Sequence, residues 1–209
     1  GYQNLLRLVS ASYLDGFYYV PRIDKDLMRQ YGKGIIALSG CLKGEIPRAC
    51  QSHDRDRAKE LIREYQEIFG PENFFLELVH HPESPTQIEV NEILIEVGHE
   101  TGTPLVATRD VHYLHPDDRE AQDVLVCIHD GKLLTDQKRT SMAFSDHSMS
   151  SPEEMVEAYK HLPEAIENTR RIADRCNVDV SLGKNHLPRF DVPEGDTDMS
   201  FLRALCEKG

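Results

Sequence analysis

The sequence predicts an α/β fold built from parallel strands, and three observations support this prediction. Short apolar stretches typical of strands alternate with longer stretches of helical periodicity, in the order strand, helix, strand, helix, strand. Each expected strand is followed by polar residues. Hydrophobic residues make up 39% and charged residues 29% of the chain, as in an ordinary globular protein. We therefore expect βα units whose strands end on one face, in a barrel or a layered sheet.

The expected helices in the first half of the chain show apolar residues at intervals of three and four positions. Asp24 and Ser84 are residue types that cap a first helical turn, and Gly70 follows the last periodic residue of its segment. These signals predict helices over residues 3–15, 24–31, 54–69 and 84–100.

The expected strands are short apolar runs between turn signals. One run ends at Gly40, the next ends before two histidines, and the third begins at Pro104. The predicted strands are residues 34–39, 73–79 and 104–108.

The second half of the chain has a different character. Residues 130–150 are polar with little periodicity, which predicts a long loop, and residues 185–198 are expected to form an extended linker. Four helices are predicted, over residues 116–128, from 151, 162–176 and 197–207, with a short strand at 178–182. We expect a boundary between residues 1–150 and residues 151–209.

Charge and cysteine content narrow the function classes. The net charge is −12 and the pI is about 5.3, which makes the chain a poor general clamp for nucleic acid but suits metal cations. No apolar run is long enough to span a bilayer, so no membrane partner is expected. The five scattered cysteines, with no CxxC pair, favour a reducing cytoplasm over a disulfide framework.

Residues that can bind metal follow all three expected strands. Cys41 follows the first, His80 and His81 the second, and Asp110 with His112 the third. In extended backbone, residues i and i+2 point to the same side, so Asp110 and His112 should project together. Thiolate, imidazole and carboxylate groups suit zinc, manganese or iron. A packed cysteine and surface histidines are the alternative interpretation.

The remaining histidines in loop-like segments are expected at the surface: His115, His129, His147 and His186. The common phosphate-loop and nucleophile-elbow motifs, GxxxxGK[ST], GxGxxG and GxSxG, are absent from the sequence.

Several motifs occur in order along the whole chain. They include Leu38-Ser39-Gly40-Cys41-Leu42, Phe75-Leu76-Glu77-Leu78, Ala107-Thr108-Arg109-Asp110-Val111-His112-Tyr113, Glu164-Ala165-Ile166-Glu167-Asn168-Thr169 and Leu187-Pro188-Arg189-Phe190. With these motifs the chain resembles, over its whole length, the PHP (polymerase and histidinol phosphatase) region of bacterial DNA polymerase III alpha subunits, the C-family replicative polymerases.

The resemblance implies a distorted (β/α)7 barrel, to which residues 1–150 contribute the C-terminal portion. Residues 151–209 would form a helical segment and proline-containing linker leading toward the polymerase palm. The implied metal ligands are Cys41, His81, Asp110 and His112, holding zinc or manganese, with His80 the weaker candidate. Arg109 stands where the family commonly has Asn.

The family's HxH strand, Asp-His motif and Glu ligand do not occur in this sequence, nor do the catalytic aspartates of the polymerase. We therefore expect a fragment lacking both ends, with the Mg-dependent polymerase site outside it. The implied partners are DNA, deoxynucleoside triphosphates, the sliding clamp, the proofreading subunit and the clamp loader. The implied chemistry of the PHP site is metal-assisted hydrolysis, as a 3′–5′ exonuclease or a pyrophosphatase.

Two other functions remain open. A free-standing PHP phosphatase would keep a similar strand-end site, but it would not need the segment between Asn177 and Gly195. A non-enzymatic scaffold would be marked by lost metal ligands, whereas four ligand types are present.

Overall fold

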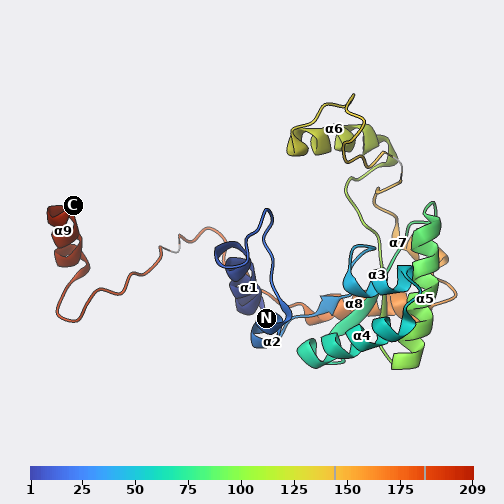
Figure 1. The fold of residues 1–209 in the computed structure, drawn as a ribbon, viewed down its shortest axis with the longest axis horizontal. Coiled ribbons are helices and arrows are strands. Elements are labelled where there is room, and N and C mark those ends of the chain that lie inside the picture. Colours follow the sequence, from blue (N-terminus) through green and yellow to red (C-terminus); the bar gives the residue numbers. More distant parts are fainter. Residues whose placement is uncertain (144, 186) are drawn as a thin grey trace. The chain divides into compact units, whose positions relative to one another are not determined.

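The computed structural model describes residues 1–143, 145–185 and 187–209, so the expectation for His186 lies outside the described residues. The chain divides into two compact units, Gly1–Asn177 and Val178–Gly209. The first contains all the described strands (Figure 1).

The sheet of the first unit has three parallel strands in the order β1-β2-β3. They are β1 (Ala37–Leu38), β2 (Phe74–Val79) and β3 (Leu105–Thr108). This confirms the predicted parallel βα pattern. A closed barrel is not seen among the described residues, and the (β/α)7 architecture stays a prediction.

Capping residues precede three helices of the first half, and Asp24 and Ser84 were predicted in this role. The side chains of Asp24, Asp54 and Ser84 each accept a hydrogen bond from a backbone N–H in the first turn that follows. The helices are α1 (Tyr2–Leu14), α2 (Lys25–Tyr31), α3 (Glu45–Gln51), α4 (Arg55–Phe69) and α5 (Pro85–Thr101).

Helix α3 was not among the predicted elements. It spans only seven residues, too few for a clear period, and Pro47 lies within it. Proline is tolerated there because the first-turn N–H groups have no partner inside the helix. Its buried residues Ile46 and Cys50 pack into the core, where α3 contacts α4 and α5.

In the second half, η1 (Pro116–Asp118) leads into α6 (Arg119–Asp130), and α7 (Pro152–Ala158) precedes α8 (Pro163–Arg175). The predicted strand at 178–182 is wrong, because these residues form no strand. None of the strands that the structure describes pairs with them, and a strand is stable only with partners. The boundary expected after residue 150 stays a prediction, although residues up to Asn177 belong to the first unit.

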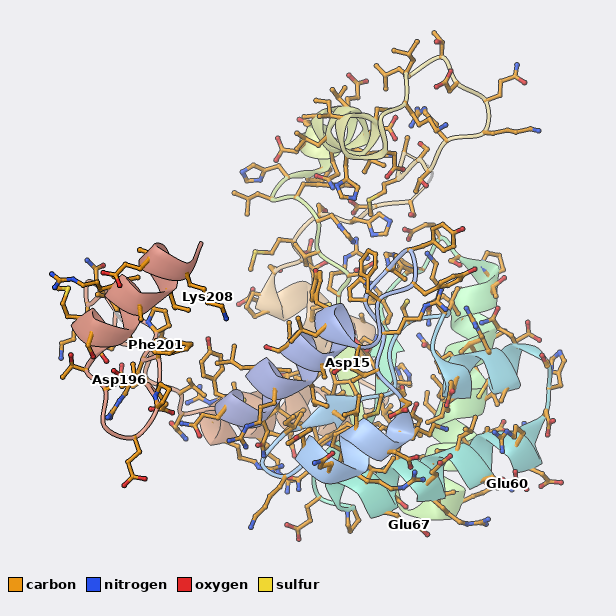
Figure 2. The ribbon with its side chains drawn as sticks, turned by 60° about the vertical axis from the view of Figure 1, so that its left-hand side comes forward. Asp15, Glu60, Glu67, Asp196, Phe201 and Lys208 are labelled. Atoms are coloured by element: carbon orange, nitrogen blue, oxygen red, sulfur yellow. The ribbon has the colours of Figure 1, made fainter. Side chains whose placement is uncertain are left out.

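The core lies on both faces of β2. Phe74, Leu76 and Leu78 are buried, and so are Phe75 and Val79 between them. Parallel strands are typically covered on both faces, so the run is apolar throughout. Figure 2 shows the opposite side of one covering helix, where Glu60 and Glu67 of α4 point outward.

Gly98 allows α5 to approach the sheet closely. A Cβ atom added there would lie 2.7 Å from a methyl carbon of Leu105 and 3.3 Å from one of Leu76. Any side chain at this position would force the Leu105 and Leu76 side chains to shift, and glycine lets the helix lie against both strands without that shift.

The second unit is an extended segment followed by α9 (Asp198–Lys208), whose first turn is capped by Thr197. The ring of Phe201, labelled in Figure 2, stacks on that of Phe190 with centroids 5.8 Å apart. None of the helices that the structure describes is long and apolar enough to cross a membrane.

Helix α8 covers the outer edge of β3, the last strand in the described sheet. The Asn168 side chain is buried, and its Nδ2 donates to the carbonyl oxygen of Leu105 at 2.7 Å. Tyr159, just after α7, donates its hydroxyl to the Leu78 carbonyl at 2.9 Å. Side chains from this region therefore satisfy backbone carbonyls of β3 and of β2.

Replacing Asn168 with alanine leaves the Leu105 carbonyl buried without this donor. We expect Asn168→Ala to lower the free energy of unfolding by about 1–3 kcal/mol in urea titrations. Thr169→Ala is the matched control, because Thr169 is exposed and bonds only within its own helix. Equal stability of the two variants would contradict the proposed role of Asn168.

The loop after α6 is fastened by a buried ion pair. Arg139 Nη1 and Nη2 donate to the two carboxylate oxygens of Asp123 at 2.8 and 2.6 Å, and Ser141 Oγ donates at 2.8 Å. These contacts, the Arg139 hydrogen bonds first, lower the pKa of Asp123 to about 2. Such two-pronged pairs fix geometry as well as charge.

Because the pKa of Asp123 lies below its unfolded value of ~3.9, the pair stabilises the fold fully above about pH 4 and fades toward about pH 2. We expect Asp123→Asn to cost about 1–3 kcal/mol at neutral pH, with a smaller cost at about pH 3. Urea titrations at the two pH values measure this. A difference independent of pH would show that the carboxylate charge is not responsible.

Candidate metal centre

The parallel sheet brings three of the predicted metal-binding residues to one edge. Cys41 follows β1, His81 follows β2 and Asp110 follows β3. All three line one pocket of about 470 Å³, together with Glu83 and Lys43. The expectation that the strand ends meet is therefore confirmed.

Asp110 lies at the centre of the side chains that could bind a cation. Its Oδ2 is 3.9 Å from His81 Nε2 and 3.5 Å from His147 Nδ1, while its Oδ1 is 3.1 Å from His112 Nε2. One ligand atom each from His81, Asp110 and His147 lies within 4.8 Å of the other two. A carboxylate with imidazoles at both oxygens can bind one cation or bridge two.

His112 lies beside Asp110, as its i+2 spacing predicted, but it is more exposed than His81, with 37% of its side chain accessible against 10%. Cys41 is exposed on the loop after β1. Neither residue belongs to the close group formed by His81, Asp110 and His147. Their role as ligands stays a prediction.

The surroundings of His81 keep its ring neutral, the form that binds metal. Burial, followed by the neighbouring His147, lowers the pKa of His81. Its Nδ1 is 3.4 Å from Glu83 Oε1, and a carboxylate at this nitrogen directs the other one, Nε2, toward Asp110. His80 instead packs its ring edge-on against Tyr159, with centroids 5.9 Å apart.

The expectation that His147 lies at the surface is wrong, because the residue is only 8% exposed. The polar segment after α6 folds back onto the end of β3, where the backbone N–H of His147 donates to the Tyr113 hydroxyl at 2.9 Å. His115 and His129 are exposed, as expected. No local periodicity could have distinguished His147 from them, because its burial depends on contacts distant in sequence.

Comparison with known proteins finds similar sequences. The PHP domain family matches residues 1–81, which include Cys41 and His81. The chain is 41% identical to the DNA polymerase III subunit alpha of Borreliella burgdorferi and 40% identical to that of Thermus aquaticus. Both alignments cover 100% of this chain but only 18% of the relative. The same holds for the Treponema pallidum subunit, at 37% identity.

The matches are collinear with the whole chain, and the strand ends that they include carry the metal-binding residue types. The chain is therefore similar, from its first residue to its last, to the PHP-containing region of bacterial DNA polymerase III alpha subunits.

Proposed function

We propose that this chain is the metal-binding PHP region of a bacterial replicative DNA polymerase, with Cys41, His81, Asp110 and His112 as ligands. The observation that carries the proposal is the convergence of His81 and Asp110 on one pocket at the parallel strand ends. The proposal includes a distorted (β/α)7 barrel containing residues 1–150, followed by the connecting segment 151–209.

The donor set fits a divalent cation. Imidazole, carboxylate and thiolate are ligands of zinc, and imidazole with carboxylate also suits manganese. His81 is held neutral by burial, and Asp110 supplies negative charge between the histidines. Zinc or manganese is therefore the expected occupant.

A cation bound here would activate water and neutralise charge on a phosphate oxygen. Asp110 and His81 would hold that cation, and Lys43 at the pocket wall would bind a phosphate oxygen of the substrate. Water would add to phosphorus while the bond to the leaving oxygen breaks. This chemistry fits a 3′–5′ exonuclease acting on DNA or a pyrophosphatase.

The proposal places template-directed DNA synthesis, with its own Mg site, in the parent protein outside this chain. DNA, deoxynucleoside triphosphates, the sliding clamp, the proofreading subunit and the clamp loader are its proposed partners, in the cytoplasm. The net charge of −12 supports this division, because extended DNA contact needs a basic surface.

Two alternatives are weighed against this proposal. A free-standing phosphatase is disfavoured because the similarity to polymerase subunits extends through residue 209. A structural role without metal predicts a folded protein that contains no cation, so a measurement of the metal content distinguishes it from the proposal.

We expect the full-length protein that contains this chain to carry zinc or manganese in elemental analysis, and an Asp110→Ala, His112→Ala double variant to lose it. A bound cation present at ~100 times its Kd also stabilises the fold by ~2.7 kcal/mol, which a thermal melt detects.

His129→Ala is the matched control, because His129 is exposed on α6 away from the pocket. Folded protein that contains no metal, or a double variant that retains it, would favour the structural role.

If the site hydrolyses phosphate esters, Asp110→Asn should reduce the rate by at least about 100-fold, because a neutral amide holds a cation poorly. Lys43→Ala should raise KM by about 10-fold through the lost charge-assisted contact, with the exposed Lys33→Ala as control. Release of nucleotides from single-stranded DNA and of phosphate from pyrophosphate are the two assays. Unchanged turnover in Asp110→Asn would assign any hydrolysis to another site.

A further inference from the structure

Residues 145–149 lie against the chain that leaves β3, although more than thirty positions separate the two segments in sequence. The backbone N–H of His112 donates to the carbonyl of His147 at 2.9 Å, and that of Met149 donates to the carbonyl of Tyr113 at 3.1 Å. Tyr113 and Ser148 form a parallel bridge. The segment therefore continues the strand-end wall of the pocket.

Arg109 fastens this segment to the sheet. Its guanidinium donates to the carbonyl oxygen of His80 at 2.5 Å, to that of Ser148 at 3.2 Å and to Asp146 Oδ2 at 2.9 Å. Only 8% of the Arg109 side chain is exposed. A buried guanidinium with three partners in fixed directions holds them in one relative geometry.

Asp146 extends the same network to His81. The backbone N–H of Asp146 donates to Glu83 Oε1 at 2.9 Å, and the same oxygen lies 3.4 Å from His81 Nδ1. The Asp146 carboxylate also accepts hydrogen bonds from the backbone N–H and the hydroxyl of Ser148, both at 3.0 Å. These contacts hold the carboxylate opposite Arg109.

The ring of His147 is oriented by its two nitrogens. Nδ1 is 3.1 Å from the carbonyl oxygen of Asp110, which can only accept, so the neutral ring donates there. Nε2 then carries the lone pair and accepts from the Ser145 hydroxyl at 2.6 Å. A carbonyl at one imidazole nitrogen with a lone pair on the other is the usual arrangement of a metal-binding histidine.

We propose that Arg109 is a positioning residue that holds residues 145–148 on the end of β3, and that this segment supplies His147 to the cation site as a further ligand. The inference rests on the proposed function and extends its ligand set beyond the strand ends. The Ser145 hydroxyl yields Nε2 by rotating about its Cα–Cβ bond.

The test is a double-mutant cycle on the full-length protein, with zinc affinity as the measurement. His147→Ala should weaken zinc binding about 10–100-fold, and Arg109→Ala should weaken it to a similar extent. If Arg109 acts through His147, the combined variant should bind no more weakly than the weaker of the single variants. Arg63→Ala, exposed on α4, is the matched control.

Asp146→Asn provides a second variant in case Arg109→Ala does not fold, because it keeps the side-chain shape while removing the charge opposite Arg109. It should reduce zinc affinity in the parent protein and should have no further effect when His147 is already alanine. Additive losses in either cycle would overturn the positioning role.

Cobalt(II) supplies a spectroscopic readout independent of activity. His147→Ala should change the d–d absorption of bound cobalt(II), because the cation would lose one imidazole ligand. Unchanged cobalt absorption, or unchanged zinc affinity in His147→Ala, would overturn the inference while leaving the proposed metal centre intact. A parent protein that binds neither cation would overturn both.

Discussion

The parallel pairing of β1, β2 and β3 is the constraint on which the candidate centre depends. Parallel strands all leave the sheet at one edge, so Cys41, His81 and Asp110 converge there although long helices separate them in sequence. The same pairing requires crossover helices, and α3, α4 and α5 pack against the face of β2 that carries Phe74, Leu76 and Leu78. The parallel direction of the strands therefore accounts for both the position of the site and the packing of the core.

Sequence reasoning succeeded where the signal was local. Asp24, Asp54 and Ser84 cap helices, as their residue types predict. The apolar run that ends before His80 and the run that follows Pro104 both form strands. It failed where structure depends on a partner. The apolar residues after Asn177 form no strand because no neighbour pairs with them. Helix α3 is short enough that packing on α4 and α5, and not periodicity, defines it.

The same division applies to the site. His81 and Asp110 follow apolar strands, so their shared edge could be predicted from the chain alone. His147 could not be predicted in this way, because it lies in a polar segment without periodicity. It is held in its buried position by hydrogen bonds to Tyr113 and Asp110. Arg109 holds that segment through tertiary contacts that local pattern does not encode.

The charged side chains that line the pocket affect the binding of both a cation and an anionic substrate. The pocket edge contains the carboxylates of Asp110 and Glu83, and Lys43 is the one Lys or Arg among the described residues that line it. The guanidinium of Arg109 is already engaged by Asp146 and two carbonyls, so it is not available to a phosphate. In a chain of net charge −12, a phosphate would meet repulsion at this edge unless a bound cation reversed the local sign. On the proposed function, a cation should therefore bind before a phosphate, and the acidic composition then favours the cation over an anionic substrate.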